Sequence, residues 1–160
     1  MKSVKRLMVL LVMGMWAGLA QAGGHLMVDN AWIREAPPGA TALAGYLTIM
    51  NHADKPRVLV GASSSAFGMV MLHRTVMEGG MAKMVHQQMI EIPANGSLTF
   101  EPNGYHLMLM KPKQQLKAGD KVDITLEFKN GDTMVVTHEV RADMGGMDHS
   151  GMDHGSMHHQ

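Results

Sequence analysis

The sequence contains no cysteine, and that absence excludes several classes of protein. No disulfide bond is available, so an exported domain of this chain has to be stabilised by its core. A blue-copper electron carrier binds its metal through a Cys thiolate, so this class is excluded as well. Any metal that the chain binds is therefore held by other side chains.

An excess of charge of one sign is also lacking, because 14 Lys and Arg residues balance 14 Asp and Glu residues. Nucleic-acid-binding proteins carry a basic surface, and this composition indicates none. The sequence contains neither a phosphate-binding loop nor a residue set for Ser- or Cys-type nucleophilic catalysis. We therefore expect no nucleic-acid partner and no enzyme.

Long apolar runs are missing except near the start. The run over residues 7–19 is shorter than the ~20 residues that span a bilayer. Three basic residues precede it and Ala20-Gln21-Ala22 follows it, an arrangement typical of a signal peptide that is cleaved near Ala22. We expect export, a mature chain that begins at Gly23, and no stable membrane insertion after cleavage.

Methionine is abundant instead. The chain has 19 methionines, of which 15 remain once residues 1–22 are removed. Protein cores use methionine sparingly, as a flexible filler of gaps. The excess indicates a role for thioether sulfur beyond packing.

Short β-branched or apolar stretches alternate with Gly, Pro, Asn and Asp from residue 26 to about residue 142, which is typical of an antiparallel β-sandwich. We expect a signal peptide over residues 1–22, one β-sandwich domain over residues 23–142, and a flexible Met- and His-rich tail over residues 143–160. The predicted strands are Met27–Arg34, Gly45–Asn51, Arg57–Ser63, Met69–Met77, Met81–Met84, Gln88–Ile92, Ser97–Phe100, His106–Met110, Lys121–Phe128 and Thr133–Val140.

The predicted strand near residue 108 carries the main functional signal. Side chains alternate between the two faces of a strand, so Leu107 and Leu109 share one face. The opposite face receives His106, Met108 and Met110. Neighbours two residues apart on a strand are close enough for an imidazole and a thioether to converge on one ion.

An earlier predicted strand repeats this device, because Met71 and His73 share a face there. Met84 adds a further sulfur. The predicted metal ligands are His73, Met84, His106 and Met108, with Met71 and Met110 as secondary candidates.

The donor types select the metal. Thioether sulfur is a soft, neutral ligand that suits Cu(I), and imidazole binds copper in either oxidation state. Zinc prefers His, Cys and carboxylate ligands to thioether. Cu(I) is therefore the metal that fits this set.

Most of the other methionines and histidines between residues 26 and 142 have an ordinary structural explanation, as core filler for Met and as surface or hydrogen-bonded residues for His. This interpretation covers Met27, Met50, Met69, Met77, Met89, Met134, His52, His86 and His138. The role of His25 stays open.

The tail is a candidate for further metal binding, because neutral imidazole is the commonest metal ligand in proteins. Its possible ligands are Met144, Met147, His149, Met152, His154, Met157, His158 and His159.

The spacing His73-x10-Met84-x21-His106-x-Met108, followed by Leu116-Lys-Ala-Gly119-Asp120-Lys-Val122, resembles that of the periplasmic copper chaperone family PCuAC, over about residues 28–140. The resemblance implies a cupredoxin-like β-sandwich with Greek-key connections that binds one Cu(I) near its surface in the periplasm. It also implies delivery of copper to the copper-A centre of cytochrome c oxidase, with a Sco-type thiol protein and oxidase subunit II as recipients. The tail resembles C-terminal Met/His extensions of some members, for which a second copper, as Cu(II) at the imidazoles, is expected.

Rival functions remain at this point. A periplasmic sequestration or resistance protein would bind copper through the same residues and deliver it nowhere. A copper monooxygenase would need His25 as its N-terminal ligand and therefore cleavage after Gly24. A plain adhesion or structural domain leaves the methionines unexplained.

Overall fold

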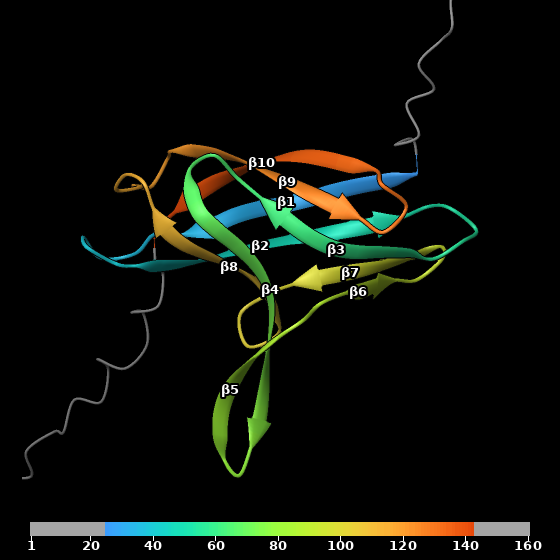
Figure 1. Ribbon diagram of the computed structural model, residues 1–160, viewed down its shortest axis with the longest axis horizontal. Coiled ribbons are helices and arrows are strands. Elements are labelled where there is room, and N and C mark those ends of the chain that lie inside the picture. Colours follow the sequence, from blue (N-terminus) through green and yellow to red (C-terminus); the bar gives the residue numbers. More distant parts are fainter. Residues whose placement is uncertain (1–24, 143–160) are drawn as a thin grey trace, which may run out of the picture.

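The computed structural model describes residues 25–142 as ten β-strands (Figure 1). The strands are β1 (Leu26–Arg34), β2 (Ala42–Asn51), β3 (Arg57–Ser63), β4 (Phe67–Glu78), β5 (Met81–His86), β6 (Ile90–Ile92), β7 (Gly96–Phe100), β8 (Tyr105–Pro112), β9 (Lys121–Phe128) and β10 (Thr133–Arg141). The described range contains no helix, so no described helix is long and apolar enough to cross a bilayer. The all-β prediction is confirmed, and each predicted strand overlaps one observed strand.

Hydrogen bonds join the strands in the order β5-β4-β8-β7-β2-β1-β10-β9-β3-β6, and β8 also pairs with β2. Most pairs are antiparallel, as predicted, whereas β1 with β10 and β7 with β8 run parallel. Because β3 contacts β4 and β6 contacts β7, the strands wrap around a single core. The predicted β-sandwich therefore includes two parallel pairings that the alternation of the sequence does not indicate.

The core follows the two-residue period of the strands. Leu107 and Leu109 on β8 are fully buried, and so are Ile124 and Leu126 on β9. The intervening residues of β8 must therefore face away from this core. That opposite face of β8 carries the predicted ligands His106 and Met108.

The described buried hydrophobic residues include no methionine. The predicted packing role is wrong for four residues, which are more than half exposed: Met27, Met69, Met77 and Met89. Met27 and Met89 are next to the buried residues Leu26 and Ile90, so alternation turns their side chains outward. The methionine excess therefore lies largely outside the core.

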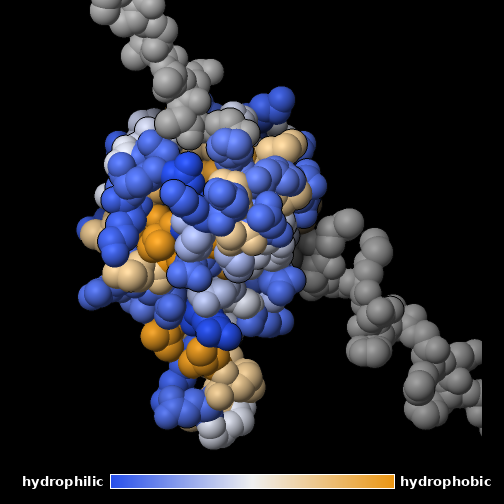
Figure 2. Space-filling view, turned by 90° about the vertical axis from the view of Figure 1, so that its right-hand side faces the viewer, coloured by the Kyte–Doolittle hydropathy of each residue, from blue (hydrophilic) through white to orange (hydrophobic). Residues whose placement is uncertain are grey.

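The end of β4 and the whole of β5 form a hairpin that projects from the body, here called the arm (Figure 1). Gly79 and Gly80 turn the chain at its tip, with φ angles of 59° and 79° that glycine adopts without a Cβ penalty. Every residue of β5 is exposed. Figure 2 shows hydrophobic side chains on this arm, and the large exposed ones are Met77, Met81, Met84 and Val85.

Candidate metal site

Strands β5, β4 and β8 bring three imidazoles into a row. His73 on β4 lies opposite His106 on β8 and opposite His86 on β5. Directly opposite residues of an antiparallel pair point to the same side of the sheet. The ring centroid of His73 is 5.8 Å from that of His106 and 5.6 Å from that of His86. Two predicted ligands, His73 and His106, are therefore neighbours.

The two predicted methionine ligands flank this row on the same face. Met108 on β8 lies opposite Met71 on β4, one side-chain step along the strand from the histidine pair. Met84 on β5 lies opposite Thr75, which is two residues from His73. The register thus places the four predicted ligands on one face of three adjacent strands.

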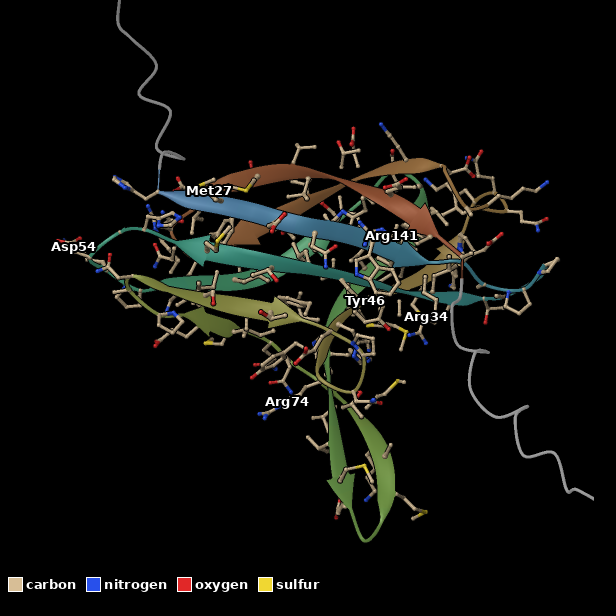
Figure 3. The ribbon with its side chains drawn as sticks, turned by 180° about the vertical axis from the view of Figure 1, so that it is seen from behind. Met27, Arg34, Tyr46, Asp54, Arg74 and Arg141 are labelled. Carbon is tan, nitrogen blue, oxygen red and sulfur yellow. The ribbon has the colours of Figure 1, made fainter. Side chains whose placement is uncertain are left out.

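A hollow of about 480 Å³ lies over this face. Met84, His106 and Met108 line one part of it, and Arg34 and Tyr46 from β1 and β2 line another. Figure 3 shows Arg34 and Tyr46 on the main body, close to the base of the arm. His106 is only 4% exposed whereas Met84 is 62% exposed, so the site runs from the body out to solvent.

The hydrogen bonds of the site leave two ring nitrogens free. Nδ1 of His106 lies 3.2 Å from the carbonyl oxygen of Gly104, which fits an Nδ1–H donor with a lone pair on Nε2. Nε2 of His106 and Nδ1 of His73 are buried and have no hydrogen-bond partner. Buried polar atoms are rarely left in this state, which costs about 1–3 kcal/mol each. A bound metal ion would satisfy both nitrogens.

Electrostatics keep the central ring in the form that binds metals. Burial lowers the pKa of His73 below its ordinary value, and positive charge on His106 and His86 lowers that pKa further. The His73 ring is therefore neutral at neutral pH, and neutral imidazole is the ligand form.

Methionine is needed to complete a metal site here. Within residues 25–142, no three His, Asp or Glu side chains come close enough together to hold a metal ion by themselves. An ion on this face would therefore take thioether sulfur as well as imidazole nitrogen. That donor set suits Cu(I) and does not suit the hard ions Ca²⁺ and Mg²⁺.

Comparison with known proteins identifies the family of this chain. The "LpqE-like" family model matches residues 26–140. "Putative lipoprotein Lxx21020" of Leifsonia xyli subsp. xyli (strain CTCB07) is 38% identical over 122 residues, which cover 76% of this chain and 72% of that protein. The chain belongs to the LpqE-like (PCuAC) family. PCuAC proteins are copper chaperones, that is, carriers and not enzymes, so both the predicted family and its non-enzymatic character are confirmed.

Solved structures show the same fold as this PCuAC-family chain. The Cu(I)-bound protein DR1885 from Deinococcus radiodurans is 38% identical, with a TM-score of 0.62 over 78% of this chain and 83% of that one. The copper-bound PCuAC domain from PmoF2 has a TM-score of 0.63 at 24% identity, over 74% of this chain and 94% of that domain, which shows the fold alone. The relative from Leifsonia is described as a lipoprotein, and lipoproteins are exported, which agrees with the predicted export.

Sequence reasoning missed His86 as a neighbour of the site. Its signal was present, because His86 follows Met84 by two residues and so shares its face of β5. Of the secondary candidates, Met71 lies opposite Met108, and Met110 lies further along the same face. The predicted signal peptide over residues 1–22 lies outside the described residues, as do the tail candidates Met144, Met147, His149, Met152, His154, Met157, His158 and His159.

Proposed function

We propose that this protein is a periplasmic copper chaperone that holds Cu(I) at His73, Met84, His106 and Met108. The observation that carries the proposal is the pair of buried ring nitrogens without partners, on His73 and His106, on a face that also presents two methionines. Two imidazoles and two thioethers form a soft, neutral set. A Cu(I)-bound relative that is 38% identical supports copper as the cargo.

Release is favoured by the unequal burial of the ligands. Met84 belongs to an exposed strand at one end of the strand order, whereas His106 is nearly buried in the body. An incoming ligand from a recipient would replace Met84 first, while His106 still holds the ion. Stepwise exchange of this kind passes copper on without releasing the free ion.

We propose that the tail captures copper, because the strand that precedes it in the sequence, β10, ends beside the hollow. Arg141, at the end of β10, pairs with Arg34, and its carbonyl oxygen accepts a hydrogen bond of 2.8 Å from the N–H of Glu35. Arg34 and Glu35 both line the hollow. In this proposal the Met and His residues after residue 142 collect Cu(I) through sulfur and Cu(II) through imidazole.

The proposed recipients are a Sco-type thiol protein and subunit II of cytochrome c oxidase, where the copper-A centre is assembled. Support comes from the motif resemblance and from membership of the PCuAC family. A deletion strain separates delivery from sequestration. Loss of oxidase activity at low copper supports delivery, and sensitivity at high copper with normal oxidase activity supports sequestration.

The ligand assignment is tested with Met84→Leu and Met108→Leu combined in a chain that ends at residue 142. Met-to-Leu replacement conserves volume, so the fold should persist. Loss of outer-sphere partners alone weakens metal sites by about 10–100-fold, so loss of two bound sulfurs should weaken anaerobic Cu(I) binding by at least ~100-fold. Met27→Leu with Met89→Leu is the matched control, because both methionines are exposed and outside the proposed ligand set. Equal Cu(I) affinity in the two double variants would refute the assignment.

A further inference from the structure

His86 stands at the solvent end of the row of three imidazoles and is not one of the four proposed ligands. It lies on β5 directly opposite His73 on β4, and the centroids of the two rings are 5.6 Å apart. On its other side, the ring centroid of His73 is 5.8 Å from that of His106. His106 is buried, His73 is half-buried and His86 is exposed. The row therefore leads from the body out to solvent.

The spacing of the rings fits two metal positions that share His73. A metal–imidazole bond is about 2.0–2.1 Å long and a ring nitrogen lies roughly 1.1 Å from its centroid, so the centroids of two rings on one ion are at most roughly 6.3 Å apart. Both neighbouring pairs in the row lie within this limit. The three rings together do not form a single site, because no three His, Asp or Glu side chains within residues 25–142 could hold one ion. An ion can thus lie between His73 and His106, or between His73 and His86.

A thioether accompanies each of the two positions. Met108 follows His106 by two residues on β8, and Met84 precedes His86 by two residues on β5. Residues two apart on a strand share a face, so each sulfur lies on the same side of the sheet as its imidazole. The inner position is the one at His106 and Met108, and the outer position is the one at Met84 and His86. Because β5 belongs to the arm, the outer position lies on the part of the molecule that projects from the body (Figure 1).

We propose that His86 is an exit ligand, which displaces His106 from the bound Cu(I) and forms the outer position together with His73. Met84, or the recipient ligand that has replaced it, completes this position. The proposal rests on the chaperone function proposed above and extends it to the path by which copper leaves. One Cu–N bond to His86 forms, while the bonds from copper to His106 and Met108 break. No electron or proton is transferred, because a neutral imidazole takes the place of neutral donors.

The shared ligand limits the row to one ion at a time. A neutral imidazole has one lone pair on its ring nitrogens, so His73 binds an ion in the inner or in the outer position but not in both. The donor types are the same in the two positions, so each suits Cu(I) and neither holds it much more strongly per ligand. The resting site has four ligands whereas the outer position has three. The ion therefore stays inside until a recipient supplies a further ligand.

The basic side chains Arg74 and Lys83 of the arm do not oppose this movement. Arg74, which marks the base of the arm in Figure 3, lies on the face of β4 opposite to the imidazoles, where its guanidinium carbon is 5.0 Å from the centroid of the Tyr105 ring. Lys83 lies on the face of β5 opposite to the proposed ligands, and its ammonium nitrogen is 2.7 Å from a carboxylate oxygen of Glu78. Both positive charges are thus turned away from the face along which a Cu(I) ion would move.

The test follows the transfer of Cu(I) from the full-length exported protein, loaded with one equivalent under anaerobic conditions, to bathocuproine disulfonate, a chelator that becomes coloured when it binds Cu(I). Stopped-flow absorbance gives the transfer rate, and competition at equilibrium gives the affinity. Loss of even an outer partner weakens a metal site by about 10–100-fold, so His86→Leu should destabilise the outer position and slow transfer by at least ~10-fold. Its affinity for Cu(I) should fall much less than that of His73→Leu, because the resting site does not use His86.

Two further variants distinguish a ligand from a structural residue. Met and Leu have similar volumes and only Met offers a sulfur donor, so His86→Met should restore most of the transfer rate that His86→Leu loses. Val85→Leu is the matched control, because Val85 is exposed on the same strand and faces the other way. This control should transfer Cu(I) at the rate of the unaltered protein.

An unaltered transfer rate in His86→Leu, or a rate as slow in His86→Met as in His86→Leu, would overturn the proposal. An affinity loss in His86→Leu as large as that in His73→Leu would also overturn it, because His86 would then belong to the resting site. Failure of the chaperone function itself is recognised in a different measurement. In that case the unaltered protein would bind Cu(I) no more tightly than His73→Leu does.

Discussion

Replacing His106 with leucine should stabilise the metal-free protein while removing its Cu(I) site. His106 is 4% exposed and its Nε2 has no partner, an arrangement that costs about 1–3 kcal/mol. The substitution also loses the hydrogen bond from Nδ1 to the Gly104 oxygen, worth about 0.5–1.5 kcal/mol. That oxygen keeps its 3.0 Å hydrogen bond from the N–H of Thr75. The balance is a gain of roughly 0.5–1.5 kcal/mol.

Thermal unfolding followed by circular dichroism, under anaerobic conditions, measures this balance. The metal-free variant should melt roughly 2–6 °C higher than the unaltered protein. Added Cu(I) should raise the melting temperature of the unaltered protein by mass action and should raise that of the variant much less. His138→Leu is the matched control, because its ring is also buried with Nδ1 3.0 Å from a carbonyl oxygen and Nε2 without a partner. This control should gain stability and keep Cu(I) binding.

A metal-free His106→Leu protein that is less stable than the unaltered one by more than ~1 kcal/mol would contradict the reasoning. It would mean that the His106 ring makes favourable interactions that outweigh its unpaired nitrogen. The site would then be built for packing, and its unpaired nitrogen would not indicate a bound metal.

Three further predictions concern other parts of the molecule. Burial lowers the pKa of His138 below its ordinary 6.5, so as the pH falls the unfolded chain binds a proton at His138 before the folded chain does. The free energy of unfolding should therefore be at its full value above pH 6.5 and decline as the pH falls below it. Urea unfolding at several pH values should show a smaller decline in His138→Leu. Replacing both Gly79 and Gly80 with alanine should lower the free energy of unfolding by about 1–2 kcal/mol per residue, because both have positive φ. The same change should misplace Met84 and so weaken Cu(I) binding, which a competition titration would measure. His86→Gln should leave the fold intact, since β5 is exposed, and should lower Cu(I) affinity less than His73→Gln does; an equal loss would make His86 a ligand.

Strand alternation is local, and it was enough to predict which residues share a face. The face of His106 and Met108 was predicted correctly because Leu107 and Leu109 mark the core side. The ten strands were likewise predictable from their turns, such as the hairpin at Asn130-Gly131, where Asn130 and Asp132 exchange hydrogen bonds.

Pairing between distant strands was not predictable, because nothing local to a strand specifies its partner. The parallel pairing of β1 with β10 brings Arg141 beside Arg34 and joins the two ends of the domain. Neither strand carries a sequence pattern that indicates this pairing. The position of His86 opposite His73 required the register of the arm. The outward direction of Met69 also depended on knowing which face of β4 the core covers.

The strand order has a kinetic consequence for a carrier. Strand β4 has neighbours on both sides, and β8 contacts three strands, whereas β5 pairs with β4 alone among the described strands. Fraying of β5 breaks hairpin hydrogen bonds and exposes no core side chain, so it belongs to the low-energy openings of the molecule. Such an opening would lower the coordination number of a bound ion from four to three while the body stays folded. Lability of the cargo and durability of the protein would therefore be set by different strands.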